Sequence, residues 1–153
     1  QQYDHETLQP VKARAYELPG LSASESADIV MLLMRIKKPS PEVVEAVEAA
    51  AAWFDRTKIT SKKIETVSVP EGLEEDRKIK KDRILVDDPD AAPIWPRYSE
   101  LSDNRPFFAT REGMKVYDLR EVPAERRVGY SWYGTWGGKV LKKYPEWHRK
   151  LGK

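Results

Sequence analysis

Residues 22–58 read SASESADIVMLLMRIKKPSPEVVEAVEAAAAWFDRTK, and this stretch carries the clearest helix signals in the chain. It begins with Ser22 and Glu25 at the spacing of a capping box, in which the serine side chain accepts a hydrogen bond from the amide three residues later. Apolar residues then recur at helical spacing: Ile29, Val30, Leu32, Leu33 and Ile36. Because proline lacks an amide hydrogen and clashes with the preceding turn, Pro39 should end this first helix.

A second helix is predicted immediately after the first. Ser40 is placed as its N-cap and Pro41 as its first residue, where a missing amide hydrogen costs little. Its apolar face repeats at intervals of three and four residues: Val43, Val44, Val47, Ala50, Ala51 and Phe54. This helix should reach about Lys58. Since only a Pro-Ser-Pro turn separates the two helices, residues 22–58 are predicted to form an antiparallel helical hairpin.

The chain after the hairpin is less regular. Residues 60–93 are predicted to form an insert-like loop, with a short strand over the β-branched run 64–69. The charge-dense run 71–81 is predicted to be a solvent-exposed excursion. A last helical stretch is expected over residues 138–151, with Pro145 restarting it.

The composition of the 153 residues bounds the broad class. With 40% apolar and 34% charged residues, the chain is typical of a globular protein rather than a disordered one. The 27 basic and 25 acidic residues are interspersed and leave a net charge of only +2, which gives no argument for a nucleic-acid partner. No apolar run approaches the ~20 residues that a membrane span needs, and no cysteine is present. The chain opens on Gln1 without a signal sequence, so we expect a processed chain or one that begins inside a larger domain.

Residues 94–134 differ in kind from the rest of the chain, because arginines and aromatic residues alternate there around turn signals. The arginines are Arg97, Arg105, Arg111, Arg120, Arg126 and Arg127. Guanidinium groups present planar, forked donors for carboxylates or phosphates, and aromatic faces pack against sugar rings or bases. A groove of extended segments and loops with this composition suits an anionic polysaccharide, a single-stranded nucleic acid, or a structural core rich in cation–π contacts.

Other kinds of site have little support. His5 and His148 stand at opposite ends of the chain, without the spacing of metal ligands. Asp87, Asp88 and Asp90 lack the spacing of an EF-hand, and a solvated turn explains them better than a calcium site does. No glycine-rich phosphate loop and no nucleophile elbow is present. The residues alone therefore single out the segment of arginines and aromatics.

A series of short motifs spans most of the chain. They are DHETLQP at 4–10, ARAYE at 13–17, WPRY at 95–98, NRPFF at 104–108, REG at 111–113, KVYDL at 115–119, ERRVGY at 125–130 and WYG at 132–134. Taken in this order, the motifs resemble those of the family-10 pectate lyases. Residues 62–81 resemble the family least.

The resemblance implies a fold and a set of partners. The fold would be mainly α, part of an (α/α)3-type helical toroid, with short strands and long loops in the 60–120 region. The chain would be the C-terminal half of the catalytic domain, and the N-terminal half of that domain would be its partner. The cofactor would be calcium, held by acidic residues upstream of Gln1, so that this chain supplies no metal ligand. Polygalacturonate or pectin would be the substrate, and the protein would be secreted or periplasmic.

The resemblance also implies roles for individual residues in β-elimination, which removes the C5 proton of a galacturonate and expels the C4 oxygen. Arg14 matches the family's Brønsted base, and Arg97 and Arg111 match its clamps on the substrate carboxylate. Arg105 and Lys115 are further candidates for substrate binding. Since a guanidinium is ordinarily protonated, an arginine base needs positive neighbours that disfavour its charge, and an alkaline optimum is predicted.

Two alternatives stay open at this point. In a structural interpretation, Arg14 ties a loop to Glu17, and Arg97 and Arg111 are scaffold residues stacked on Trp95 or Tyr98. In a binding interpretation, the chain is a non-catalytic module for pectin or another acidic polysaccharide, and the fragment by itself has no lyase activity.

Overall fold

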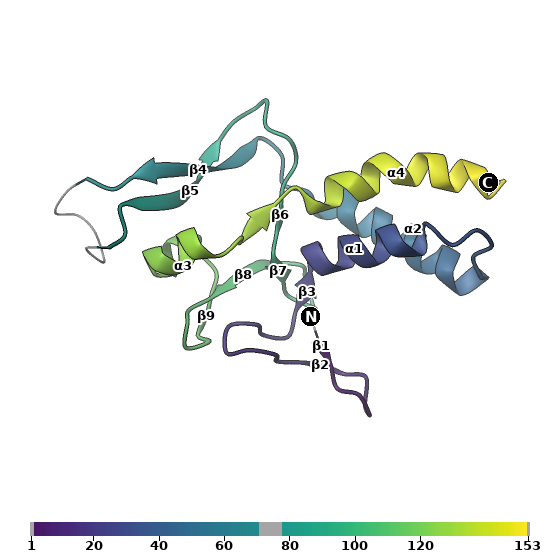
Figure 1. Ribbon diagram of the computed structural model, residues 1–153, viewed down its shortest axis with the longest axis horizontal. Helices are drawn as coiled ribbons and strands as arrows, with labels where there is room; N and C mark the ends of the chain where they lie inside the picture. The colour runs from purple at the N-terminus through teal and green to yellow at the C-terminus, as the bar shows by residue number, and fades with distance from the viewer. Residues whose placement is uncertain (1, 71–77, 153) are drawn as a thin grey trace.

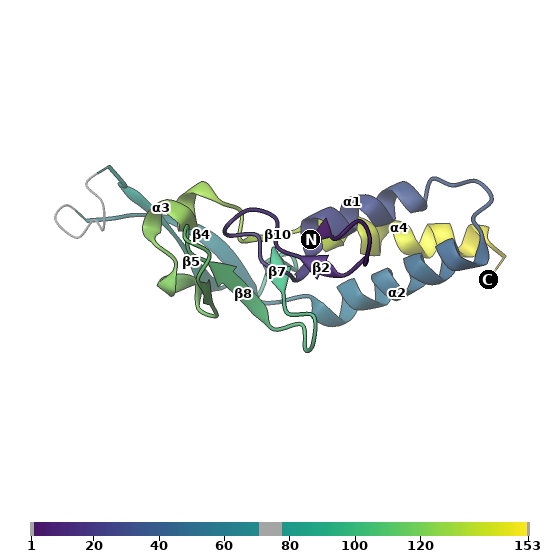
Figure 2. The ribbon, with the colours of Figure 1, turned by 90° about the horizontal axis from the view of Figure 1, so that it is seen from below.

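The computed structural model describes residues 2–70 and 78–152. Three helices gather at one end of an elongated molecule, and the longest hairpin lies at the other end (Figures 1 and 2). Two clusters of buried residues correspond to these parts. One lies among the helices, and the other lies among short strands and aromatic side chains.

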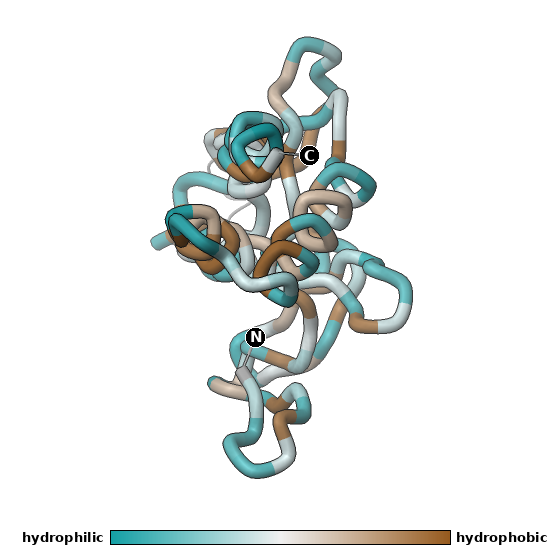
Figure 3. The backbone as a smooth tube through the Cα atoms, turned by 90° about the vertical axis from the view of Figure 1, so that its right-hand side faces the viewer, coloured by the Kyte–Doolittle hydropathy of each residue, from teal (hydrophilic) through white to brown (hydrophobic). Residues whose placement is uncertain are grey.

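The helical part contains α1 (Ala23–Leu33), α2 (Pro41–Thr57) and α4 (Trp136–Lys150). α2 runs back along α1, and α4 lies against both, which confirms the predicted hairpin (Figure 2). Seen from the end, the hydrophobic stretches gather where the helices meet, and the outer side of α4 is hydrophilic (Figure 3). The most deeply buried side chains here include Val47, Phe54 and Val140. None of the described helices is long and apolar enough to cross a membrane.

The helix ends follow the sequence signals only in part. The Ser40 side chain accepts a hydrogen bond from the Val43 amide, as predicted for an N-cap. The capping box predicted at the start of α1 does not form. Ser22 donates its hydroxyl hydrogen to the Glu25 carboxylate instead, because that carboxylate is turned toward Arg97. The prediction that Pro145 restarts the last helix is also wrong, since α4 continues through it.

The strand predicted within residues 60–93 is confirmed, but the segment is a hairpin rather than a loop. β4 (Lys62–Ser68) pairs antiparallel with β5 (Lys81–Asp87), in a register that runs from Lys62 opposite Asp87 to Ser68 opposite Lys81. Most of the charge-dense excursion predicted over 71–81 lies outside the described residues.

The second core is built from strands of two to four residues. β3 (Leu21–Ser22), β7 (Tyr98–Ser99), β8 (Pro106–Ala109) and β9 (Lys115–Val116) form a sheet in that order. β6 (Trp95–Pro96) pairs with β10 (Tyr133–Gly134), and β1 (Gln2–Tyr3) pairs with β2 (Pro10–Val11). The extended segments predicted between residues 95 and 117 are thereby confirmed.

Two short helical segments not foreseen in the sequence complete this part of the molecule. They are a single 3-10 turn at Leu119–Glu121 and α3 at Ala124–Gly129. α3 lies beside β5, on the side of the molecule away from the three-helix end (Figure 1). This helix carries Glu125 and Arg126.

Trp95 joins the two parts. Its indole nitrogen donates a hydrogen bond to the carbonyl oxygen of Phe54 at 2.9 Å, although the residues are 41 positions apart. The first turn of α4 packs closely on the same pair. A Cβ atom on Gly137 would lie 2.6 Å from atoms of both the Phe54 and Trp95 rings. Glycine at this position therefore allows α4 to approach them.

The predicted fold class, a mainly α helical toroid, is wrong for this chain. The described residues form four α-helices and ten short strands in four antiparallel sheets. The three long helices account for one end only. Between α2 and α4 the chain is rich in β-branched and aromatic residues, which favour extended backbone and bury side chains alternately.

Candidate functional site

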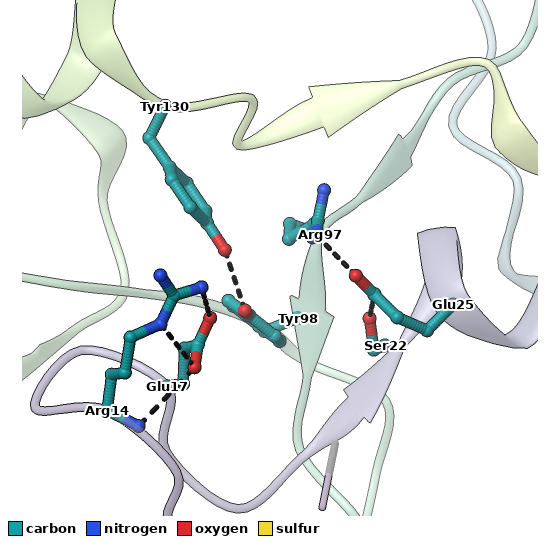
Figure 4. A network of polar contacts seen from close by, with 7 residues as sticks. All are labelled: Arg14, Glu17, Ser22, Glu25, Arg97, Tyr98 and Tyr130. Carbon is teal, nitrogen blue, oxygen red and sulfur yellow. Dashed lines mark hydrogen bonds and ion pairs between the residues drawn. The ribbon is translucent and has the colours of Figure 1, made fainter.

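A hollow of about 620 Å³ lies between the loop before β3 and the start of α1. Its lining consists of Lys12, Ala13, Arg14, Glu17, Leu18, Glu25 and Tyr98. Figure 4 shows the polar network around it, with Arg14 and Glu17 on one side, Arg97, Glu25 and Ser22 on the other, and the hydroxyls of Tyr98 and Tyr130 between them. Arg14 thus lines the hollow itself, and Arg97 pairs with Glu25 in its lining.

Arg14 sits in a tight loop that is closed by its own ion pair. Its guanidinium donates to Glu17 through Nε at 2.9 Å and Nη2 at 2.5 Å, and the Glu17 amide donates to the Arg14 carbonyl. The carboxylate raises the pKa of Arg14, and the guanidinium lowers the pKa of Glu17. With 67% of its side chain exposed, Arg14 is accessible to a ligand but is held firmly protonated.

Arg97 lies between β6 and β7 and is mostly buried. Its guanidinium pairs with Glu25 and lies over the rings of Tyr130 and Trp136, 5.5 Å from each centroid. Its backbone amide donates to the carbonyl of Trp132 at 2.6 Å. Its Nε atom is buried and has no hydrogen-bond partner among the described residues. Packing on two aromatic rings fixes the plane of this guanidinium.

Arg111 follows β8 and is held by α3. Its Nε and Nη2 donate to the two carboxylate oxygens of Glu125 at 2.9 and 2.7 Å, and this pair raises the pKa of Arg111. The turn that carries Arg111 packs on the Arg14 loop. A Cβ atom on Gly113, whose φ is +88°, would lie 2.1 Å from the carbonyl oxygen of Ala15. This contact brings Arg111 to the same side of the molecule as Arg14.

A stack of aromatic rings lies behind the arginines. The hydroxyls of Tyr98 and Tyr130 are 2.7 Å apart, and the Tyr16 ring meets the Tyr130 ring edge-on at 5.8 Å. Burial, followed by the hydrogen bond with Tyr130, raises the pKa of the Tyr98 hydroxyl, which therefore stays protonated. The tyrosines offer hydroxyls and ring faces to a ligand.

Arg105 and Lys115, the other predicted substrate contacts, belong to a second cluster. Lys115 donates to Glu100 at 2.7 Å, and the Tyr117 hydroxyl donates to the same carboxylate oxygen. The Arg105 guanidinium lies 3.8 Å from the centroid of the Tyr117 ring. Neither cation lines the hollow beside Arg14. Arg97 and Arg111 reach the hollow indirectly, through Glu25 in its lining and through the Gly113 turn that packs on the Arg14 loop. The described contacts of Arg105 and Lys115 lie in their own cluster.

Sequence reasoning missed several residues that build the site. Glu25 lies 72 positions before its partner Arg97, and Glu125 lies 14 positions after Arg111. Neither spacing belongs to a motif, so no signal in the sequence marks these pairs. Arg126 was counted among the arginines but given no role. It is buried beneath Tyr16, with its guanidinium 4.2 Å from the ring centroid.

The weaker alternatives can also be placed. Asp87 and Asp88 pair with Lys62 and Lys63 at the base of the β4–β5 hairpin. His148 lies 3.4 Å from Glu48. No group of three histidine or acidic residues that could hold a metal ion occurs in the described ranges 2–70 and 78–152.

Comparisons with known proteins agree with the resemblance in the motifs. Residues 1–141 match the model of the pectic acid lyase family. Two solved structures are similar to this chain: a family 10 polysaccharide lyase from Cellvibrio cellulosa, and a mutant of that lyase, an aspartate replaced by alanine, in complex with trigalacturonic acid. Each is 34% identical with a TM-score of 0.76, and the match covers 95% of this chain and 42% of the other. This chain thus spans about two fifths of their length. No curated protein matches it significantly.

Proposed function

We propose, for a chain that belongs to the pectic acid lyase family, that it supplies the arginine side of a site that cleaves polygalacturonate by β-elimination. One observation carries the proposal. Arg14 lines a hollow together with Tyr98 and Glu25, Glu25 pairs with Arg97, and the turn of Arg111 packs against the Arg14 loop. The trigalacturonic acid bound in one similar structure supports a galacturonate chain as the ligand.

The three arginines suit this ligand for a specific reason. Each one is already paired with a glutamate, so each is aimed at a carboxylate. A galacturonate carboxylate has the same planar, two-oxygen shape and can take the place of a glutamate at the forked donors. We propose that Arg97 and Arg111 bind substrate carboxylates in this way. The fixed positive charge also favours the negative charge that develops when the C5 proton leaves.

The base is the most demanding part of the proposal. We propose Arg14, which must be neutral to accept the C5 proton. Glu17 acts against this, since it raises the pKa of Arg14. The ion pair between Arg14 and Glu17 must therefore open before Arg14 can act as the base. Repulsion between a substrate carboxylate and the Glu17 carboxylate offers one route to this opening.

Calcium fits the described residues of this chain poorly. Three carboxylates near the arginines, those of Glu17, Glu25 and Glu125, each pair with a guanidinium. Within residues 2–70 and 78–152, no acidic cluster is available for a hard cation, which prefers six or more oxygen ligands. We therefore propose calcium only as a cofactor of the complete lyase, with ligands from a polypeptide other than this segment, and we assign no step to it here.

The partner in this proposal is the polypeptide that completes the fold of the similar lyases, because this chain matches 42% of their length. The chain by itself would then bind pectate without cleaving it, which is also what a non-catalytic pectin-binding module would do. We propose a secreted or periplasmic location, where polymeric pectin is accessible.

The test compares the chain alone with the chain joined to that completing polypeptide. Unsaturated product is followed by its near-ultraviolet absorbance during incubation with polygalacturonate. We expect product only from the completed protein, and loss of product with Arg14→Ala but not with the control Arg120→Ala, whose side chain is 87% exposed. Product formation that survives Arg14→Ala would exclude Arg14 as the base. Gel retardation by pectate without product from the completed protein would favour the binding module.

A further inference from the structure

Arg126 is a buried cation for which the proposed function gives no role. It lies in α3 and is only 7% exposed. Its Nε and Nη2 atoms are buried without a hydrogen-bond partner among the described residues. Buried guanidinium donors are normally satisfied, since an unmade hydrogen bond at a charge is costly. Hydrogen bonds from these two atoms therefore do not explain how the guanidinium is held.

The surroundings of Arg126 are aromatic. The centre of its guanidinium lies 4.2 Å from the centroid of Tyr16, 5.1 Å from that of Tyr130 and 5.8 Å from that of Trp132. Its backbone carbonyl accepts hydrogen bonds from the Trp132 indole and the Tyr130 amide. A planar cation attracts the negative faces of such rings, and the attraction is strongest where water is excluded. Arg126 therefore fixes the orientation of this group of rings.

The same rings contact Arg14 and Arg97. Tyr16 is shared by Arg126 and Arg14, whose guanidinium is 5.3 Å from the Tyr16 centroid. Tyr130 is likewise shared by Arg126 and Arg97. On α3, the residue before Arg126 is Glu125, which binds Arg111. The Arg126 guanidinium thus contacts a ring partner of Arg14 and one of Arg97, and Arg126 is adjacent in sequence to the partner of Arg111.

We propose that Arg126 is a positioning residue: stacked against Tyr16 and Tyr130, it holds Arg14 and Arg97 in the orientation that receives galacturonate carboxylates. The proposal rests on the proposed function for its ligand, but not for its geometry. It predicts that the planar guanidinium matters, and not the charge alone.

The first experiment needs no ligand. Hydrogen exchange of the Arg14 and Arg97 Nε–H groups is measured by NMR in the 153-residue chain. Arg126→Met fills the space among the aromatic rings without a guanidinium. Arg120→Met is the control that loses the same charge at an exposed position. We expect exchange at least about tenfold faster in Arg126→Met and unchanged in the control. Unchanged exchange in a folded Arg126→Met chain would overturn the proposal.

The second experiment measures trigalacturonate binding by calorimetry. Arg126→Met should weaken binding about tenfold and should remove most of the further loss caused by Arg14→Ala, because the two residues act through one ring. Additive losses would indicate a merely structural role and overturn the proposal. Arg126→Lys keeps the charge without the planar group and should bind as weakly as Arg126→Met. Wild-type affinity in Arg126→Lys would refute stacking.

Two outcomes are kept apart by this design. If the wild-type chain does not bind trigalacturonate, the proposed function fails while the exchange experiment still decides the role of Arg126. If Arg126→Met does not fold, Arg126→Lys takes its place in the exchange experiment. Faster exchange at Arg14 and Arg97 in that variant supports the proposal, and unchanged exchange contradicts it.

Discussion

The ion pair between Asp82 and Arg127 should be the strongest single polar contribution to the stability of the strand-rich part. The guanidinium of Arg127 donates to both carboxylate oxygens of Asp82 at 2.7 Å, with side-chain exposures of 7% for Arg127 and 18% for Asp82. The pair ties β5 to α3, the helix that carries Glu125 and Arg126. Asp82→Asn removes the negative charge and keeps the shape, so it tests this tie directly.

The expected loss follows from the burial of the pair. Removing one partner of a buried ion pair costs about 3–5 kcal/mol. Asp82 keeps some contact with water, and Arg127 still donates to the carbonyls of Arg120 and Val122, so we expect a loss of about 2 kcal/mol. At about 2–4 °C per kcal/mol for a chain of this size, the melting temperature should fall by about 4–8 °C.

The pH dependence of this stability loss provides a second, independent test of the prediction. Arg127 lowers the pKa of Asp82 below 3.8. A lowered carboxyl pKa contributes stability that is fully present above the unfolded pKa of about 3.9 and is lost as the pH falls through the folded value. The difference in melting temperature between wild type and Asp82→Asn should therefore be full at neutral pH and should shrink below about pH 4.

The assay is thermal unfolding followed by circular dichroism, with Asp87→Asn as the control. Asp87 lies on the same strand and pairs with Lys62 at the surface, where its side chain is 84% exposed. A surface pair contributes about 0–1 kcal/mol, so the control should melt within about 3 °C of wild type. Equal effects of the two substitutions, or a deficit of Asp82→Asn that persists at low pH, would refute the reasoning.

Three further predictions follow from the packing and from the arginine stack. Gly137→Ala places a Cβ atom against Phe54 and Trp95 and should destabilise the chain by about 1–3 kcal/mol in urea unfolding. Gly138→Ala, where a Cβ atom meets open space, should be neutral or stabilising, and the reverse order would contradict the packing. Pro145→Ala restores a backbone donor inside α4 and should raise the stability by about 1–2 kcal/mol; a lower melting temperature would show that the proline is needed there. Arg97→Lys keeps the charge but loses the stack on Tyr130 and Trp136, and calorimetry should show about tenfold weaker trigalacturonate binding, while unchanged affinity would remove Arg97 from the site.

The sequence predicts those parts of the fold that depend on local signals. α2 carries its own N-cap, a proline at its first position and an apolar stripe, and both of its predicted ends are confirmed within a residue or two. The sequence predicts only the first strand of the β4–β5 hairpin, because the register pairs residues 13 to 25 positions apart across a charged segment. Pro145 gave a wrong signal, since packing of α4 on α1 and α2 outweighs the loss of one backbone hydrogen bond.

The site shows the same limit more sharply. Motifs single out Arg14, Arg97 and Arg111 as individual residues, but not what each one binds. Tertiary structure brings Glu25 to Arg97 and Glu125 to Arg111, and neither sequence separation matches a helical or strand repeat. Only Glu17, three residues from Arg14, could be named in advance. The helical toroid was predicted from the resemblance rather than from periodicity, and the structure contradicts it.

The central claim is that Arg14, Arg97 and Arg111 together recognise galacturonate carboxylates. The most direct test is to titrate trigalacturonate into the isotope-labelled 153-residue chain and to follow the arginine Nε–H signals by NMR. We predict that the signals of Arg14, Arg97 and Arg111 shift together with one dissociation constant, while that of Arg120 stays in place. Shifts confined to other arginines, or none at all at millimolar ligand, would contradict the claim.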